Sequence, residues 1–343
     1  IIVDFSDEPA NIFADQVTLD HMIIGDADDN SFQGDTVSLI IKDRATNWLQ
    51  AYPAKNKSGR SVVVAFQSYF GPNCRPKLIF SDNSKEIQMA CEHLLYSHDT
   101  STPHIPQSNG VAERAIDKVK SGTRCQLTQS GMPHECWAWA QQCYCFLANV
   151  TDVDLVIGKT AYEHRFGIQY AGHCVPFGAL VDFVPNAKWQ RENVPKAGTR
   201  TVPGIFLGYE FQDGGRFRQK YRVCPLSAFE TSGTGLPKGN KLQVITVPRL
   251  VLEPHQDKCT FPLYEARRKY TTTIQQPLPV GADIRIEFDV EDGVEPVSSE
   301  PPAQRHDLGP GNLSQPGDLS LIHISEPTRP ERIGYGGVWV EKK

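Results

Sequence analysis

The alternation of apolar and polar residues divides this chain into three parts. In the first part, three short apolar runs predict the strands of an antiparallel meander, at 16–24, 36–42 and 48–52. A helix is expected over 58–69, with Ser58 as a candidate N-cap, and a buried strand over 77–80 leads into a second helix over 85–96. A strand, helix and strand in this order are typical of an α/β layered domain, which we place at 13–168 after a linker at 1–12.

The second part is helical. The segment PHIPQSNG at 103–110 is expected to be a loop, because proline and Asn-Gly are turn residues. Amphipathic helices are predicted over 111–131 and 133–149. The inward stripe of the first helix is expected to consist of Ala112, Ile116, Val119, Thr123 and Leu127. We interpret the aromatic stripe of the second helix as core or oligomer contacts.

The third part consists of short β segments separated by glycine and proline. Candidate strands lie at 179–184, 204–209, 220–223 and 243–252. Their spacing predicts a small all-β barrel over 172–256. Proline, serine, glutamate and glutamine dominate after residue 275, so we expect a disordered linker over 257–318.

Charge is unevenly distributed over the 343 residues, whose formal net charge is −5. Residues 1–35 contain nine acids and no lysine or arginine, whereas 176–255 contain eleven lysines and arginines against six acids. The basic third part therefore suits a nucleic acid even though the whole chain is acidic. The nine cysteines include no Cys-x-x-Cys pair, which favours reduced thiols of an intracellular protein over a zinc site.

Three acids lie at positions where the neighbouring residues make a carboxylate energetically unfavourable. Asp20 interrupts an apolar strand, Asp82 ends one, and Glu113 begins a helix directly after a loop. Each has an alternative explanation, as a strand-edge acid, a helix N-cap and an acid favoured by the helix dipole, respectively. Together they would converge from adjacent strand ends and a facing helix. Carboxylates about 4 Å apart repel by ~4 kcal/mol per pair at an effective dielectric near 20, so such a cluster needs cations. Oxygen ligands favour Mg²⁺ or Mn²⁺.

Several segments resemble a known family. LDHM at 19–22, KDRATNWLQAYPAK at 42–55, FSDNSKE at 80–86 and TPHIPQSNGVAERA at 102–115 resemble the DDE integrase core of copia-type retrotransposons, which has a ribonuclease-H-like mixed sheet flanked by helices. GKTAYEHRFG at 158–167 and VPGIFLGYE at 202–210 are similar to the family's segment after the core and its Src-homology-3-like C-terminal barrel. The resemblance covers roughly residues 13–255.

The resemblance implies a function and a site. Asp20, Asp82 and Glu113 would be the catalytic residues and the ligands of two Mg²⁺ or Mn²⁺ ions. The family trims the 3′ ends of its element DNA and transfers them to target DNA. The implied partners are double-stranded DNA and further copies of the chain, with no membrane and no small-molecule substrate, in a cytoplasmic particle and then the nucleus.

Four residues are candidate DNA contacts. Gln107 and Asn109 lie in the predicted loop, and Lys120 and Arg124 share the helix face of Glu113 at seven and eleven positions further on. The alternative for the two cations is an ordinary solvated helix face.

Two departures from the family leave a second function open. Glu113 follows Asp82 by 31 positions, fewer than in many relatives, and Asp117 occupies a position that is usually basic. The alternative is a catalytically decayed DNA-binding remnant. A different nuclease of the same fold would not require VPGIFLGYE, and a two-carboxylate glycoside hydrolase explains neither the third acid nor the basic region.

The last 25 residues differ in origin from the rest of the chain in our interpretation. LSLIHISEPTR at 319–329 resembles the translation of a common sequencing adapter. We therefore expect 319–343 to be an artefact and exclude it from fold reasoning.

Overall fold

The computed structural model describes residues 9–24, 30–100, 110–185, 195, 197–230, 242–252 and 259–273. All of them belong to one compact unit, Ile1–Gly281. A second unit, Ala282–Lys343, contains no described residue. The predicted artefact at 319–343 and most of the predicted linker at 257–318 thus lie outside the described residues.

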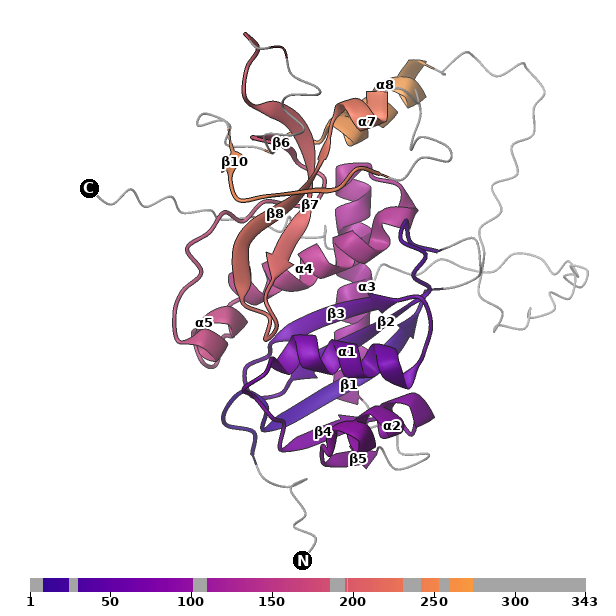
Figure 1. Ribbon diagram of the computed structural model, residues 1–343, viewed down its shortest axis with the longest axis vertical. Coiled ribbons are helices and arrows are strands. Elements are labelled where there is room, and N and C mark those ends of the chain that lie inside the picture. Colours follow the sequence, from indigo (N-terminus) through magenta and orange to yellow (C-terminus); the bar gives the residue numbers. More distant parts are fainter. Residues whose placement is uncertain are drawn as a thin grey trace, which may run out of the picture. The chain divides into compact units, whose positions relative to one another are not determined.

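The first sheet is mixed. It has the strand order β3-β2-β1-β4-β5 and comprises β1 Gln16–Ile23, β2 Val37–Asp43, β3 Leu49–Ala54, β4 Leu78–Ser81 and β5 His98–Thr100. The first three strands form the predicted antiparallel meander, and β4 and β5 add to β1 in parallel. Helices cover the sheet, which confirms the predicted α/β class with a mixed sheet (Figure 1).

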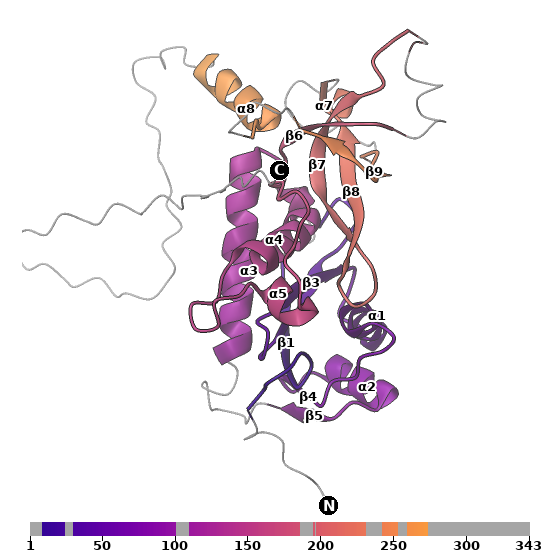
Figure 2. The same ribbon diagram turned by 90° about the vertical axis from the view of Figure 1, so that its left-hand side faces the viewer.

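Two pairs of helices flank this sheet on opposite faces. They are α1 Gly59–Phe70, α2 Lys85–Leu94, α3 Gly110–Ser130 and α4 Trp137–Thr151, the last preceded by a 3-10 turn, η3 His134–Cys136. Figure 2 shows α3 and α4 on one side of β1 and β3, and α1 and α2 on the other. Ser58 caps α1 as predicted, because its hydroxyl accepts a hydrogen bond from the Ser61 amide.

Alternate residues of β1 enter two different cores, as the two-residue period of a strand requires. Val17 and Leu19 belong to the larger hydrophobic cluster, which includes Val62 of α1. Met22 belongs to a smaller cluster with Val119 of α3. The even-numbered residues of β1 therefore face α3.

Helix α3 buries much of its predicted stripe. Ala112, Val119 and Thr123 are buried, whereas Ile116 and Leu127 are half-buried. Gly122 lies at a close approach of α3 to α4, since a Cβ added there would overlap the ring of Tyr144. The absence of a side chain at this position thus allows the two helices to pack.

The second sheet is antiparallel throughout. It has the strand order β10-β6-β7-β8-β9 and comprises β6 Leu180–Phe183, β7 Val202–Phe211, β8 Phe217–Pro225, β9 Ile245–Val247 and β10 Leu250–Val251. The strand predicted over 243–252 is divided in two, because Pro248 lies between β9 and β10 and has no amide to donate. Closure of this sheet into the expected barrel stays a prediction.

The β7–β8 hairpin contacts the first sheet's domain through its tip. The Gly214 amide donates to the carbonyl of Ser68 near the end of α1 (2.7 Å). Arg165, in α5 Ala161–Phe166, donates from Nη2 to the carbonyls of Tyr69 (2.9 Å) and Gly214 (2.7 Å). The larger hydrophobic cluster includes residues of both sheets. The division into domains at 13–168 and 172–256 stays a prediction.

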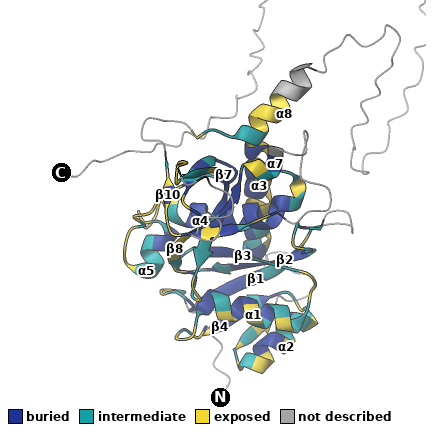
Figure 3. Cartoon of the chain, turned by 45° about the horizontal axis from the view of Figure 1, so that its top comes forward, coloured by how far each residue is buried: buried dark blue, intermediate teal, exposed yellow. Residues whose placement is uncertain are grey.

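Two helices follow the second sheet's main strands: α7 Ser227–Glu230 and α8 Pro262–Thr273. Helix α8 stands where a disordered linker was predicted to begin. It starts with Pro262, a favoured first residue of a helix, and its beginning lies against Gly131 at the end of α3, where an added Cβ would overlap the backbone of Tyr264. From Tyr264 to Arg268 its residues are exposed (Figure 3). No helix in the described ranges is long and apolar enough to cross a membrane.

Candidate active site

The parallel register of β1 and β4 places Asp20 and Asp82 at the same level. Thr18 pairs with Phe80, so two residues further along each chain Asp20 stands opposite Asp82, which directly follows β4. Neighbouring strands lie about 4.8 Å apart, and level residues of parallel strands point to the same face. Both acids therefore stand on the sheet face that α3 covers.

The local contacts of the two aspartates differ. Asp20 Oδ1 accepts a hydrogen bond from the His21 amide (2.6 Å). Asp82 Oδ1 accepts one from the Ser84 amide (3.3 Å), and Ser84 is the N-cap of α2 without a side-chain capping bond. Asp82 is thus two residues outside the cap position, so N-capping of α2 does not account for it.

Glu113 lies in the first turn of α3 and is exposed. One turn further on, Ile116 packs against the smaller cluster that contains Met22 of β1. Within the ranges that the structure describes, no group of three or more His, Cys, Asp or Glu side chains is arranged to hold a metal ion. The structure therefore brings Asp20 and Asp82 to neighbouring positions and places Glu113 on the covering helix, without joining all three.

Two histidines near the Asp82 end of the sheet were not anticipated. His98 Nε2 lies 2.8 Å from Ser81 Oγ, and burial lowers the pKa of His98. Burial also lowers the pKa of His21, and in both cases the Asp82 carboxylate opposes the shift. His21 lies in the LDHM segment, but its role was not predicted there, and His98 belongs to no segment that was singled out; their placement depends on the parallel pairing of β4 with β5 and on the position of β1.

The predicted DNA contacts are only partly described. Lys120 and Arg124 are exposed on α3, on the flank that also carries Glu113 and Asp117. Gln107 and Asn109 lie outside the described residues. The role of all four stays a prediction.

A separate cavity of about 180 Å³ lies at the edge strand β3. It is lined by side chains of β3, α1, α4 and the β7–β8 hairpin, including Gln50, Gln142 and Arg222. None of the predicted catalytic residues lines it. The predicted site and this cavity are therefore separate.

Comparisons with known proteins find similarity to transposon polyproteins. No family model matches the chain. It is similar to the retrovirus-related Pol polyprotein from transposon TNT 1-94 of Nicotiana tabacum, with 27% identity over 206 residues, 56% of this chain and 15% of that protein. It is also similar to the retrovirus-related Pol polyprotein from transposon RE2 of Arabidopsis thaliana, with 26% identity over 135 residues, 38% of this chain and 9% of that protein. These relatives confirm the predicted resemblance to retrotransposon polyproteins.

Solved structures with some similarity include two retroviral integrase cores. The HTLV-2 integrase catalytic core domain in complex with magnesium has a TM-score of 0.35 and 18% identity, covering 45% of this chain and 97% of that one. The catalytic core domain of BIV integrase has a TM-score of 0.32 and 18% identity, covering 44% of this chain and 92% of that one. The assignment of this chain to the α/β class rests on its own sheet order and helix placement.

Proposed function

We propose that this chain is the catalytic part of a retrotransposon integrase, a ribonuclease-H-like enzyme that trims the ends of its element's DNA and joins them to target DNA. The parallel pairing of β1 with β4, which pairs Thr18 with Phe80 two residues before Asp20 and Asp82, is the observation that carries the proposal. The similarity to transposon Pol polyproteins supports it.

The acids fit a divalent metal by their chemistry. Carboxylate oxygens are the ligands that Mg²⁺ and Mn²⁺ prefer. Asp20 offers them from β1, and Asp82 offers them from directly after the neighbouring strand β4; paired strands lie about 4.8 Å apart. Glu113 would add the third carboxylate from the first turn of α3. In this proposal the three acids hold two Mg²⁺ or Mn²⁺ ions.

The side chains of this protein would position the metal ions and would not themselves react with DNA. Bound divalent ions would supply charge for an in-line displacement at a phosphodiester. Asp20 and Asp82 would fix the ligand oxygens, because their backbones are held by the sheet and by the buried residues before them. Neither is proposed to bond covalently to DNA; water would attack in end trimming and a DNA 3′-hydroxyl in joining.

The partners follow from the same proposal. Double-stranded DNA would contact Gln107 and Asn109 in the loop, and Lys120 and Arg124 on α3. The second sheet would be the Src-homology-3-like barrel. Its edges β9 and β10 are separated by only two residues, Pro248 and Arg249, so the sheet must curl to bring its edges within their reach. A homo-oligomer that acts first in the cytoplasm and then in the nucleus completes the proposal.

A strand-transfer assay tests this function. The full chain is incubated with its element's terminal DNA, a target plasmid and Mg²⁺ or Mn²⁺. We expect joined products from the parent and none from Asp82→Asn. The matched control is Asp99→Asn, which changes an exposed acid on the adjacent strand β5 and should leave the product yield unchanged.

The outcomes separate the proposal from its alternative. Equal yields from the parent and Asp82→Asn would contradict it. A parent chain that binds DNA but yields no product with either metal would instead support the catalytically decayed DNA-binding remnant.

A further inference from the structure

A half-buried arginine lies beside the aspartate pair. Arg44 donates from Nε to Thr18 Oγ1 (2.7 Å) and from Nη1 to Gln16 Oε1 (3.3 Å), and its Cζ lies 5.0 Å from the ring centroid of Phe80. Thr18 and Phe80 are each two residues before an aspartate of the pair. At about 3.3 Å of rise per residue, the guanidinium is thus roughly 7 Å along the strands from the acids, on the same sheet face.

A lysine continues this positive charge across the sheet. Lys42 of β2 pairs directly with Thr18, so its side chain shares the face that Arg44 occupies. The Lys42 side chain is half-buried. Burial lowers its pKa, and the nearby Lys118 and Arg114 lower it further. Lys42 is therefore close enough to two other cations to be repelled by them.

Those two cations come from α3. Arg114 and Lys118 are one turn apart, so they share a flank of the helix. Lys118 and Lys120 are two positions apart, about 200° around the helix, so Lys118 is on the opposite flank from the DNA contact predicted at Lys120. We call Lys42, Arg44, Arg114 and Lys118 the cationic row.

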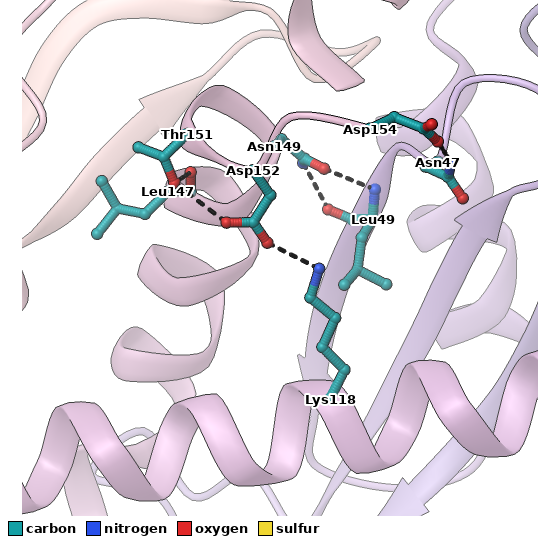
Figure 4. A network of polar contacts seen from close by, with 8 residues as sticks. All are labelled: Asn47, Leu49, Lys118, Leu147, Asn149, Thr151, Asp152 and Asp154. Carbon is teal, nitrogen blue, oxygen red and sulfur yellow. Dashed lines mark hydrogen bonds and ion pairs between the residues drawn. The ribbon is translucent and has the colours of Figure 1, made fainter. Parts of the chain in front are cut away.

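The acids near the cationic row compensate only part of its charge. Lys118 pairs with Asp152 (2.8 Å), as Figure 4 shows. Asp154 attracts Lys42 but is held by the Asn47 side chain at 2.8 Å. Among the described residues, no carboxylate lies within 4.0 Å of the Lys42 or Arg44 charge. Asp152 therefore pairs with only one of the four cations, and Lys42 and Arg44 have no carboxylate in direct contact within the described part of the chain.

Half-buried cations without acidic partners favour an anionic ligand, since burial of a charge is costly unless an opposite charge meets it. The guanidinium of Arg44 keeps Nη2 without an acceptor in the part of the chain that is described, and such a group suits a phosphate oxygen. The row extends from Arg44 beside the aspartate pair through Lys42 of β2 to α3.

We propose that the cationic row binds successive phosphates of the DNA strand whose phosphodiester lies at Asp20 and Asp82. This inference rests on the proposed function for the identity of the substrate. It assigns Arg44 and Lys42 to the strand at the reaction site. The row would thus position that strand independently of the opposite flank of α3.

Salt dependence of DNA binding tests the row without requiring catalysis. Fluorescence anisotropy measures binding of the full chain to a labelled random-sequence duplex, in EDTA and over a series of NaCl concentrations. Each lost phosphate contact should make the slope of log K against log salt shallower by about 0.9. We expect this change for Arg44→Gln, Lys42→Gln and Lys118→Gln. The control Arg60→Gln removes an exposed charge from α1, on the other face of the sheet, and should keep the parent slope.

The results have distinct consequences. Parent-like slopes for Lys42→Gln and Lys118→Gln would overturn the proposal, as would an equal change in Arg60→Gln. If Arg44→Gln fails to fold because its bonds to Thr18 and Gln16 are absent, the two lysine variants decide. Strand transfer by the parent is scored separately: parent-like slopes with intact strand transfer refute only the row, and shallower slopes without strand transfer refute only the catalytic function.

Discussion

Arg165 is one of the residues that attach the β7–β8 hairpin to the α/β domain. Arg165 Nη2 donates to the carbonyls of Tyr69 and Gly214, and its Cζ lies 3.6 Å from the ring centroid of Phe13 and 4.7 Å from that of Trp48. Lysine keeps the charge but has no planar fork to donate to both carbonyls while lying flat on the rings. We therefore expect Arg165→Lys to loosen the hairpin and destabilise the fold.

The magnitude follows from the interactions that a lysine at this position cannot make. A hydrogen bond to a charged group contributes about 1.5–3 kcal/mol, and a desolvated cation–π contact about 0.5–2 kcal/mol. Removal of one such bond and weakening of the ring interactions gives about 3 kcal/mol. For a folded part of this size, that corresponds to a melting temperature lower by roughly 6–12 °C.

Urea unfolding followed by circular dichroism measures this change. The matched control is Arg216→Lys, because Arg216 is exposed and, among the described residues, lies over a single ring, that of Phe166, at 5.2 Å. The control should change the free energy of unfolding by less than about 0.5 kcal/mol. A decrease under about 1 kcal/mol for Arg165→Lys would refute the reasoning, since the buried fork would then contribute no more than a surface charge.

Three further predictions concern packing, pH and thiols. Gly122→Ala should destabilise the fold by about 1–3 kcal/mol in a thermal melt, because its Cβ would overlap the Tyr144 ring; Ser121→Ala, on the exposed side, should be neutral. Burial raises the pKa of Asp15, but hydrogen bonds from Lys77 and two backbone amides outweigh it and leave the pKa below 3.8. The stability that Asp15 contributes is therefore present above pH 3.8 and is lost as the pH falls through the pKa of Asp15 in the folded chain. The unfolding free energies of the parent and of Asp15→Asn should thus converge in acid. A difference between them that stays constant with pH would contradict this. Iodoacetamide should modify the exposed thiols in the folded chain and the buried thiols only after unfolding. Burial raises the pKa of the buried thiols, which are those of Cys91, Cys136, Cys143, Cys145 and Cys224. Labelling of these thiols before unfolding would contradict their burial.

The elements predicted best from the sequence are those in which the spacing of apolar residues repeats over several residues. Helices α1 to α4 and strands β1 to β4 were anticipated because each buries one face, and the residue spacing records that face. Strand β5 was missed, since three polar residues carry no period and are extended only through pairing with β4. Helix α8 was missed because few of its residues contact the core.

Some residues of the candidate site could likewise be recognised from the sequence, and others could not. Asp20 and Asp82 could be recognised as acids in or after apolar strands, and the parallel register brings them level. Glu113 could be recognised as an acid that begins a helix after a turn-rich loop, and it lies in the first turn of α3. Arg44 could not be singled out, because its place beside the acids is set by the fold of a turn and by hydrogen bonds to residues 26 and 28 positions away.

The central claim, that Asp20, Asp82 and Glu113 hold divalent metal, is tested most directly by thermal melts with and without Mg²⁺ or Mn²⁺. Metal at about 100 times its Kd should stabilise the parent by about 2.7 kcal/mol. Asp82→Asn removes one ligand and one repelling charge but keeps an acceptor for the Ser84 amide. It should therefore melt no lower than the parent without metal and gain little when metal is added. A metal-induced shift as large in Asp82→Asn as in the parent would contradict the account.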